Sequence, residues 1–253
     1  MPNHVTNVVS VSDLGGSDLA SVHSALLNDE RQVDFNVIKP MPDCLRDFSP
    51  NSGILSRASM ALGLLDEPVQ DASSISELTS NMAFSNAMRE ATKPPREEDA
   101  VNIVRAIENH RKCGYLYWYD WSVEHWETKW NAYDQPEHGY DRTADSFRFQ
   151  TAWSHPSALI THLSKTCPSV VFDIGYADED LGSNCGTYTL KNGRRSDETI
   201  APNFNSQTPD EQAKFTKLAF GICYADEDPA SQGYDENWRY SEDVYDAFHA
   251  KAS

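Results

Sequence analysis

The sequence is short of positive charge. Its 253 residues include 21 lysines and arginines against 39 aspartates and glutamates, which gives a formal net charge of −18 at pH 7. The phosphate backbone of nucleic acids selects lysine and arginine, and an anionic membrane attracts the same residues. The charge therefore argues against direct binding to nucleic acid or to a membrane surface. It favours a protein partner with a basic surface.

Long apolar runs are also absent. No stretch approaches the roughly 18 apolar residues of a membrane-spanning helix. The first seven residues, MPNHVTN, lack the basic and apolar regions of a signal peptide, so we expect a cytoplasmic protein. The hydrophobic content of 39% is nevertheless too high for a disordered acidic tail. The chain has enough apolar residues for a folded core.

Motifs that carry common chemistry are missing as well. There is no G-x-S-x-G, Walker A, G-x-G-x-x-G or H-E-x-x-H pattern, so we predict no catalytic residue and no cofactor. The five cysteines form no C-x-x-C pair, and we expect reduced thiols rather than a zinc site or a disulfide framework. They are spread along the chain as Cys44, Cys113, Cys167, Cys185 and Cys223.

Two regions of the chain, residues 5–38 and 147–176, show the alternation of strands and the periodicity of helices in a recognisable order. Residues 5–12 and 33–38 predict strands on either side of a helix that carries Leu19, Val22 and Leu26. Residues 147–153 and 170–176 predict two more strands around a helix that begins near Pro156. Two successive strand–helix–strand units predict an α+β fold, the ferredoxin-like split βαβ sheet.

A large helical insertion is predicted between the second and third strands. It occupies residues 43–144, whereas residues 1–42 and 145–192 form the ferredoxin-like core. Within it we expect a weakly amphipathic helix around 75–82 and a clearer one from Glu97 to a C-cap at Gly114. Eight aromatic residues follow between 115 and 133. Helical spacing places four apolar side chains on one face, which predicts a Trp-rich core for the insertion: Tyr119, Val123, Trp126 and Trp130.

The remaining residues, 193–253, are expected to form an acidic, helical C-terminal extension. A strand over 186–191 turns at Asn192-Gly193, and helices are predicted near 208–220 and 240–250. Residues 173–253 contain 16 acidic and 7 basic residues, so half of the net charge lies in the last third of the chain.

The five residues YADED occur twice in this acidic region. One copy follows a predicted strand and the second follows the segment FGIC; an internal duplication and convergence on an acidic turn both explain the repeat. Its carboxylates could bind a metal through oxygen, but they lack the alternation of a calcium loop, and solvated acidic turns are the simpler interpretation. We assign no metal site and treat six residues as a candidate partner-binding surface: Asp178, Glu179, Asp180, Asp226, Glu227 and Asp228.

Several blocks resemble the YubB-like family of plasmid- and phage-borne proteins. They are MPNHVTN at the start, KPMP at 39–42, WYDWSVEHWETKWNAYD at 118–134, TAWSHPSALITHLSK at 151–165 and YADEDLGSNCG at 176–186. The sequence departs from the family pattern at His4 and Glu127, where tryptophan and glycine are expected. The resemblance implies a ferredoxin-like domain and a mobile genetic element in a bacterial host, but no reaction.

These observations favour a non-enzymatic interaction protein of a phage or plasmid. Its carboxylates would imitate a phosphate backbone and occupy a host DNA- or RNA-handling complex, as a counter-defence inhibitor would. Two alternatives remain open at this point. One is a metal-dependent hydrolase that uses the YADED carboxylates, and the other is a regulatory module whose acidity serves only solubility.

Overall fold

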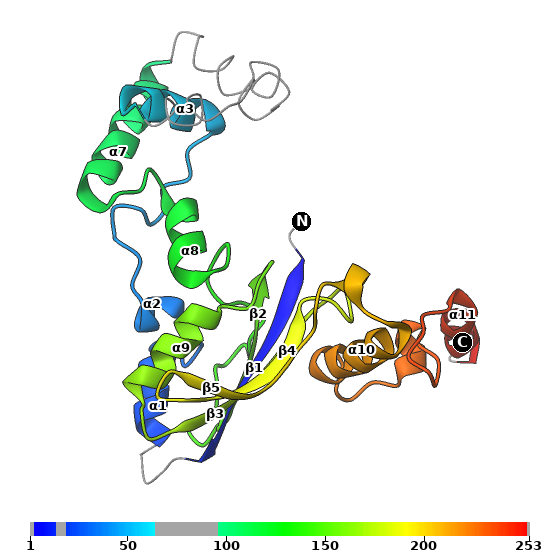
Figure 1. Ribbon diagram of the computed structural model, residues 1–253. Coiled ribbons are helices and arrows are strands. Elements are labelled where there is room, and N and C mark those ends of the chain that lie inside the picture. Colours follow the sequence, from blue (N-terminus) through cyan, green and yellow to red (C-terminus); the bar gives the residue numbers. More distant parts are fainter. Residues whose placement is uncertain (1–2, 14–18, 64–95, 252–253) are drawn as a thin grey trace. The chain divides into compact units, whose positions relative to one another are not determined.

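The computed structural model describes residues 3–13, 19–63 and 96–251. The chain divides into two compact units, Met1–Pro40 with Val123–Ser253, and Met41–Ser122, which we call the sheet unit and the inserted unit. The sheet unit contains a five-stranded antiparallel sheet of order β2-β1-β3-β4-β5 (Figure 1). Its strands are β1 (His4–Asp13), β2 (Ser146–Ala152), β3 (Val171–Asp178), β4 (Cys185–Lys191) and β5 (Arg194–Ile200).

Strand β1 lies between β2 and β3 and is antiparallel to both. Strands β2 and β3 are therefore parallel to each other, and helix α9 (Ser157–Thr166) connects them across β1. This is a split βαβ arrangement. It confirms the predicted α+β, ferredoxin-like class, with a helical insertion and C-terminal helices.

Helices cover the two faces of the sheet unequally. Helices α1 (Leu19–Leu26), α2 (Phe35–Ile38) and α9 lie on one side, and α10 (Pro209–Cys223) lies on the other (Figure 1). Alternate strand residues point to the first side and are buried, because successive side chains of a strand face opposite ways. They form the core together with Leu26, Leu159 and Leu163, and include Val5, Val9, Phe147, Phe149, Phe172, Ile174 and Leu190.

The strand predicted at 33–38 is wrong. Only Val33 makes an isolated bridge, to Leu27, and the chain then turns into α2. The physical reason is local: the Asp34 side chain accepts a hydrogen bond from Asn36 N and caps the helix. In addition, the backbone N–H groups of Val33 and Phe35 donate to side chains, and not to a neighbouring strand. The outer edge of β2 is met instead by Tyr133, which bridges Gln150.

The C-terminal boundary also differs from the prediction. Residues 194–200 form β5 and extend the sheet, so the extension predicted to begin at 193 begins with a strand. The turn predicted at Asn192-Gly193 is confirmed, with both residues at positive φ (48° and 73°). The two predicted C-terminal helices are confirmed as α10 and α11 (Glu242–Lys251). Two 3₁₀ helices, η1 (Phe204–Ser206) and η2 (Pro229–Gln232), flank α10.

The inserted unit has a small apolar core in its described part. Helices α3 (Ser52–Ala61) and α7 (Glu97–Cys113) pack around Phe48, Ala58, Ala106 and Leu116. Gly114 ends α7 at φ 87°, as predicted for a left-handed C-cap. The predicted helix around 75–82 lies outside the described residues.

The predicted Trp-rich core of the insertion is wrong for three of its four members, because Val123, Trp126 and Trp130 belong to the sheet unit. Helix α8 (Trp118–Trp126) ends before Trp130, since Glu127 has φ 60°, so the four side chains do not share one helical face. Val123 is 41% exposed. Trp126 is buried in the sheet unit, where its ring meets Phe35 edge to face and its Nε1 donates to Lys39 O.

The inserted unit accordingly ends at Ser122 and not at residue 144. Residues after Ser122 bond to the sheet unit: Thr128 Oγ1 donates to Ala152 O, and Asn131 Nδ2 donates to Asp34. Among the described residues, none of the helices has the length and apolar character needed to cross a bilayer.

Replacing Trp126 with alanine is expected to lower the free energy of unfolding of the sheet unit by about 3–5 kcal/mol, because a buried indole is removed. Trp126→Phe keeps most of the ring contact and loses the bond to Lys39 O, at about 1 kcal/mol. Urea unfolding with amide hydrogen exchange measures both. If amides of α3 and α7 lost protection while those of β2 did not, Trp126 would belong to the inserted unit after all.

Candidate functional site

The first YADED copy forms a tight turn at the end of β3. Asp178 is 5% exposed, and its carboxylate accepts three hydrogen bonds, from Asn3 Nδ2 (3.1 Å), Asn184 Nδ2 (3.0 Å) and Asp180 N (3.0 Å). Asp178 therefore shapes the turn and does not face a partner, which corrects its assignment to the partner-binding surface. Glu179 and Asp180 are exposed, as that assignment requires.

The N-terminal strand fixes this turn in place. Glu179 N donates to His4 O at 2.9 Å, and His4 N donates to the Glu179 carboxylate at 3.1 Å. Asn3 Nδ2 also donates to Asp180 at 2.9 Å. Because these bonds tie the turn to the start of β1, the two exposed carboxylates project from a rigid part of the sheet unit.

The second YADED copy has a different structure. It follows α10, which ends at Cys223, and Asp228 caps η2 by accepting a hydrogen bond from Ala230 N. Asp226, Glu227 and Asp228 are all exposed. One copy thus follows a strand and the other a helix, so the repeat does not reflect a duplicated structural unit.

The two turns nevertheless lie close together. Cys223 Sγ lies 3.7 Å from Ala177 O, immediately before the first turn. Burial raises the pKa of the Tyr224 phenol, and the carboxylates of Glu227 and Glu179, one from each turn, raise it further. A hollow of about 420 Å³ opens beside the first turn and is lined by Glu179, Asp180, Leu181, Ser183, Phe204 and Tyr234.

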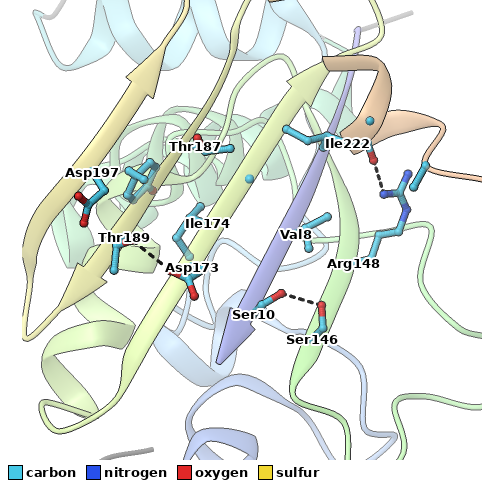
Figure 2. Close-up of a pocket in the computed structure, with 14 residues that line it drawn as sticks. Val8, Ser10, Ser146, Arg148, Asp173, Ile174, Thr187, Thr189, Asp197 and Ile222 are labelled. Atoms are coloured by element: carbon cyan, nitrogen blue, oxygen red, sulfur yellow. Dashed lines mark hydrogen bonds between the residues drawn. The ribbon is translucent and has the colours of Figure 1, made fainter. Parts of the chain in front are cut away.

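A larger groove of about 540 Å³ lies on the sheet face that α10 only partly covers (Figure 2). Its floor consists of two rows of directly paired residues. One row is polar throughout and crosses four strands as Ser146, Ser10, Asp173 and Thr189. The other row runs through Arg148, Val8, Gly175 and Thr187. Asp197 of β5, at φ 51°, lines the groove from its side.

Hydrogen bonds hold the polar row of the groove. Ser10 Oγ and Ser146 Oγ lie 2.8 Å apart, and Thr189 Oγ1 donates to Asp173 at 3.0 Å (Figure 2). These partners leave Asp173 exposed. The groove therefore offers a carboxylate surrounded by hydroxyl groups that can donate or accept.

Arg148 is the basic side chain among the groove residues, and its guanidinium is already engaged. Nη1 donates to Ile222 O and Nη2 donates to Cys223 O at 2.7 Å, so the side chain satisfies carbonyls at the last turn of α10. With Arg148 committed to the helix end, Asp173 and Asp197 determine what charge the groove attracts. A cationic group fits it better than an anionic one.

A second constellation, on the opposite face of the sheet, is buried. His155 lies between Asn7 and Tyr188, with Nδ1 at 2.7 Å from Asn7 Oδ1 and Nε2 at 2.5 Å from Tyr188 Oη. The Asn7 amide nitrogen donates to Val5 O and to Thr151 Oγ1, so its oxygen must accept from His155. His155 is therefore protonated on Nδ1, and the Tyr188 hydroxyl donates to Nε2.

These residues are of the types found in proton relays, but neither solvent nor a substrate has access to them. His155 is 8% exposed, stacks on the Tyr176 ring at 4.4 Å and lines none of the described pockets. Burial lowers the pKa of His155 to about 3, so the ring is neutral. Every polar atom of the ring has a partner, and the network supports the structure of the sheet unit.

In the described part of the chain, no three His, Cys, Asp or Glu side chains are placed to hold one metal ion. The YADED repeat, which predicted the site residues, does not indicate the groove. Polar residues at every second strand position, such as Ser10, Arg148 and Asp173, were the available signal.

Comparison with known proteins agrees with the fold. Residues 125–219 match the family described as a ferredoxin-like domain in Api92-like protein. The match covers less than half of the chain and includes β2, α9, β3, β4 and β5. Comparisons with curated proteins and with solved structures return no match.

The buried His155 predicts a pH dependence of stability. Its pKa is about 3 in the folded protein and near 6.5 when unfolded, so the unfolded state binds the extra proton as the pH falls below 6.5. This contribution costs about 2 kcal/mol of folding free energy at pH 5 and grows until about pH 3. Urea unfolding from pH 7.5 to 4.5 measures it.

The control is His155→Gln, whose amide can replace both hydrogen bonds without titrating. We expect this variant to be less stable at pH 7 and to lose less stability on acidification. An identical slope of stability against pH in both proteins would contradict the assignment.

Proposed function

We propose that the protein is a non-enzymatic, acidic interaction protein that binds the basic surface of a protein that handles nucleic acid. One observation carries the proposal. Among the described residues from 173 to the C-terminus, no carboxylate forms an ion pair with a described lysine or arginine. Exposed charge of one sign that is left uncompensated favours association with a surface of the opposite sign.

The inserted unit provides an internal contrast. There Arg46 pairs with Asp43 at 3.4 Å, and Arg96 pairs with Glu98 and with Asp99. The chain thus compensates some carboxylates locally, whereas those near the groove and the acidic turns remain available. Among the described residues, the ion pairs between lysine or arginine and a carboxylate therefore all lie in the inserted unit.

The groove and the two turns supply the contacts in this proposal. Lysine or arginine side chains of the partner would reach Asp173 and Asp197 in the groove, and Glu179, Asp180, Asp226, Glu227 and Asp228 beside it. The hydroxyls of Ser10, Ser146 and Thr187 would accept hydrogen bonds that guanidinium groups otherwise make to water or to phosphate oxygens. A protein that recognises a phosphate backbone has donors of this kind.

The resemblance to plasmid- and phage-borne proteins narrows the setting of the proposal. A mobile element in a bacterial host would make the protein, and the target would be a host complex that handles or defends against foreign nucleic acid. Imitating the charge of a phosphate backbone would block that complex without catalysis.

A capture experiment tests the proposal. The purified protein is immobilised, incubated with host extract at low salt and eluted with a salt gradient or with duplex DNA. A mimic predicts a partner that elutes with either, because counterions and phosphates compete for the same basic residues. Binding that is unchanged between 50 and 300 mM salt, or that DNA does not displace, would rule mimicry out.

Matched charge-neutral variants locate the contact. Asp173→Asn with Asp197→Asn keeps the bond from Thr189 and suits the positive φ at residue 197. Asp243→Asn with Asp246→Asn removes the same charge from exposed positions of α11. We expect the groove pair to weaken the captured partner's affinity by about tenfold, near 1.4 kcal/mol, and the α11 pair by less than threefold. Equal losses would show that only total charge matters.

A further inference from the structure

Two cysteines of the inserted unit are in contact although 69 positions separate them. The sulfur atoms of Cys44 and Cys113 lie 3.8 Å apart, and both side chains are half-buried. Among the described residues, which include all five cysteines, no other two sulfur atoms lie within hydrogen-bond contact. The sequence alone does not predict this contact, because the five cysteines show no paired spacing.

Structure on both sides holds the two thiols together. Cys113 is the last residue of α7, and its Sγ donates to Asn109 O at 3.2 Å. Asn109 is itself buried and donates to Leu116 O. Next to Cys44, Leu45 is fully buried, and Leu45 N donates to Pro42 O in a turn. The sulfur contact therefore follows from packing that anchors both backbones.

We propose that Cys44 and Cys113 are a reversible thiol–disulfide site that reacts with small-molecule disulfides such as oxidised glutathione. The thiolate of one cysteine attacks the glutathione disulfide, forms a mixed disulfide and releases one glutathione thiolate. The second cysteine thiolate attacks the protein sulfur of that mixed disulfide, forms the Cys44–Cys113 bond and releases the second glutathione. The two cysteine protons pass to solvent and then to the departing thiolates, so the protein loses two electrons that glutathione gains.

The position of the pair gives the bond a structural effect. Cys44 follows the start of the inserted unit at Met41, and Cys113 precedes its end at Ser122. A bond between them closes a loop that contains all of α3 and all of α7. Closing a loop of this length restricts the unfolded chain strongly, so oxidation would stabilise the inserted unit.

The chemistry also predicts a pH dependence. Burial raises the pKa of the Cys113 thiol, so its reactive thiolate is scarce at neutral pH. The rate of bond formation should therefore increase with pH over the alkaline range. This readout is independent of the stability of the fold.

Peptide mapping after equilibration with oxidised and reduced glutathione tests the proposal. Remaining thiols are alkylated, and the protein is digested with trypsin without reduction. Trypsin cleavage after lysine and arginine places Cys44 on peptide 32–46 and Cys113 on peptide 113–129. We expect these peptides to be linked in the oxidised sample and separate after dithiothreitol. The thermal unfolding midpoint of the oxidised protein should be higher by roughly 5 °C or more.

Two variants complete the test. Cys44→Ser should abolish the linked peptide and the thermal shift, whereas Cys223→Ser, which removes another half-buried thiol, should leave both unchanged. Absence of the linked peptide at every glutathione ratio, or a linked peptide with an unchanged or lower midpoint, would overturn the proposal.

Discussion

Pairing of β1 with both of its neighbours is the constraint on which the sheet unit depends. This strand comes from the start of the chain, and its partners β2 and β3 come from beyond residue 145. Its N-terminal end also shapes the first acidic turn, through Asn3 and His4. From the middle of the strand, Asn7 fixes the tautomer of His155. Bonds from one short segment thus reach the core, the acidic turn and the floor of the groove. A long insertion within such a sheet is tolerated because loop-closure entropy rises only slowly with length.

Alternation along β1 separates the core from the binding face. Val5, Asn7 and Val9 are fully buried on the helix side, whereas Val8 and Ser10 line the groove on the other side. Any change of register by one residue would exchange the two sets and place a polar row against the core. The same pairing that buries the apolar residues therefore aligns Ser146, Ser10, Asp173 and Thr189 into one row. The register of the strands therefore creates the groove. Its side chains point away from the core, so substituting them leaves no cavity there.

Local sequence patterns predicted most helices and strands, but not which of these elements pair or pack with one another. The alternation at 5–12, 147–153 and 170–176 and the C-cap of α7 were sufficient, because periodicity and capping are local. The failures come from contacts distant in sequence. Residues 33–38 alternate like a strand, yet Asn131 and Gln135 bind their backbone N–H groups, and Asp34 caps a helix. The Trp126 side chain has helical spacing with Trp130, but α8 ends between them. Strand order, and with it the groove, is not contained in any single segment.

The two YADED copies show how flanking sequence gives identical residues different roles. In the first copy, the alternation of Phe172, Ile174 and Tyr176 continues into the turn. Asp178 therefore stays on strand β3, where it is buried and accepts hydrogen bonds from amide groups. In the second, the preceding residues have helical periodicity, and Phe215, Ala219 and Phe220 bury one face of α10. The chain therefore leaves the helix before Asp226, and its three carboxylates stay in water. Of the six repeated acids, Asp178 is buried and the other five lie at the surface. Because no described lysine or arginine forms an ion pair with these carboxylates, their mutual repulsion is a cost to the free protein that a basic partner would relieve.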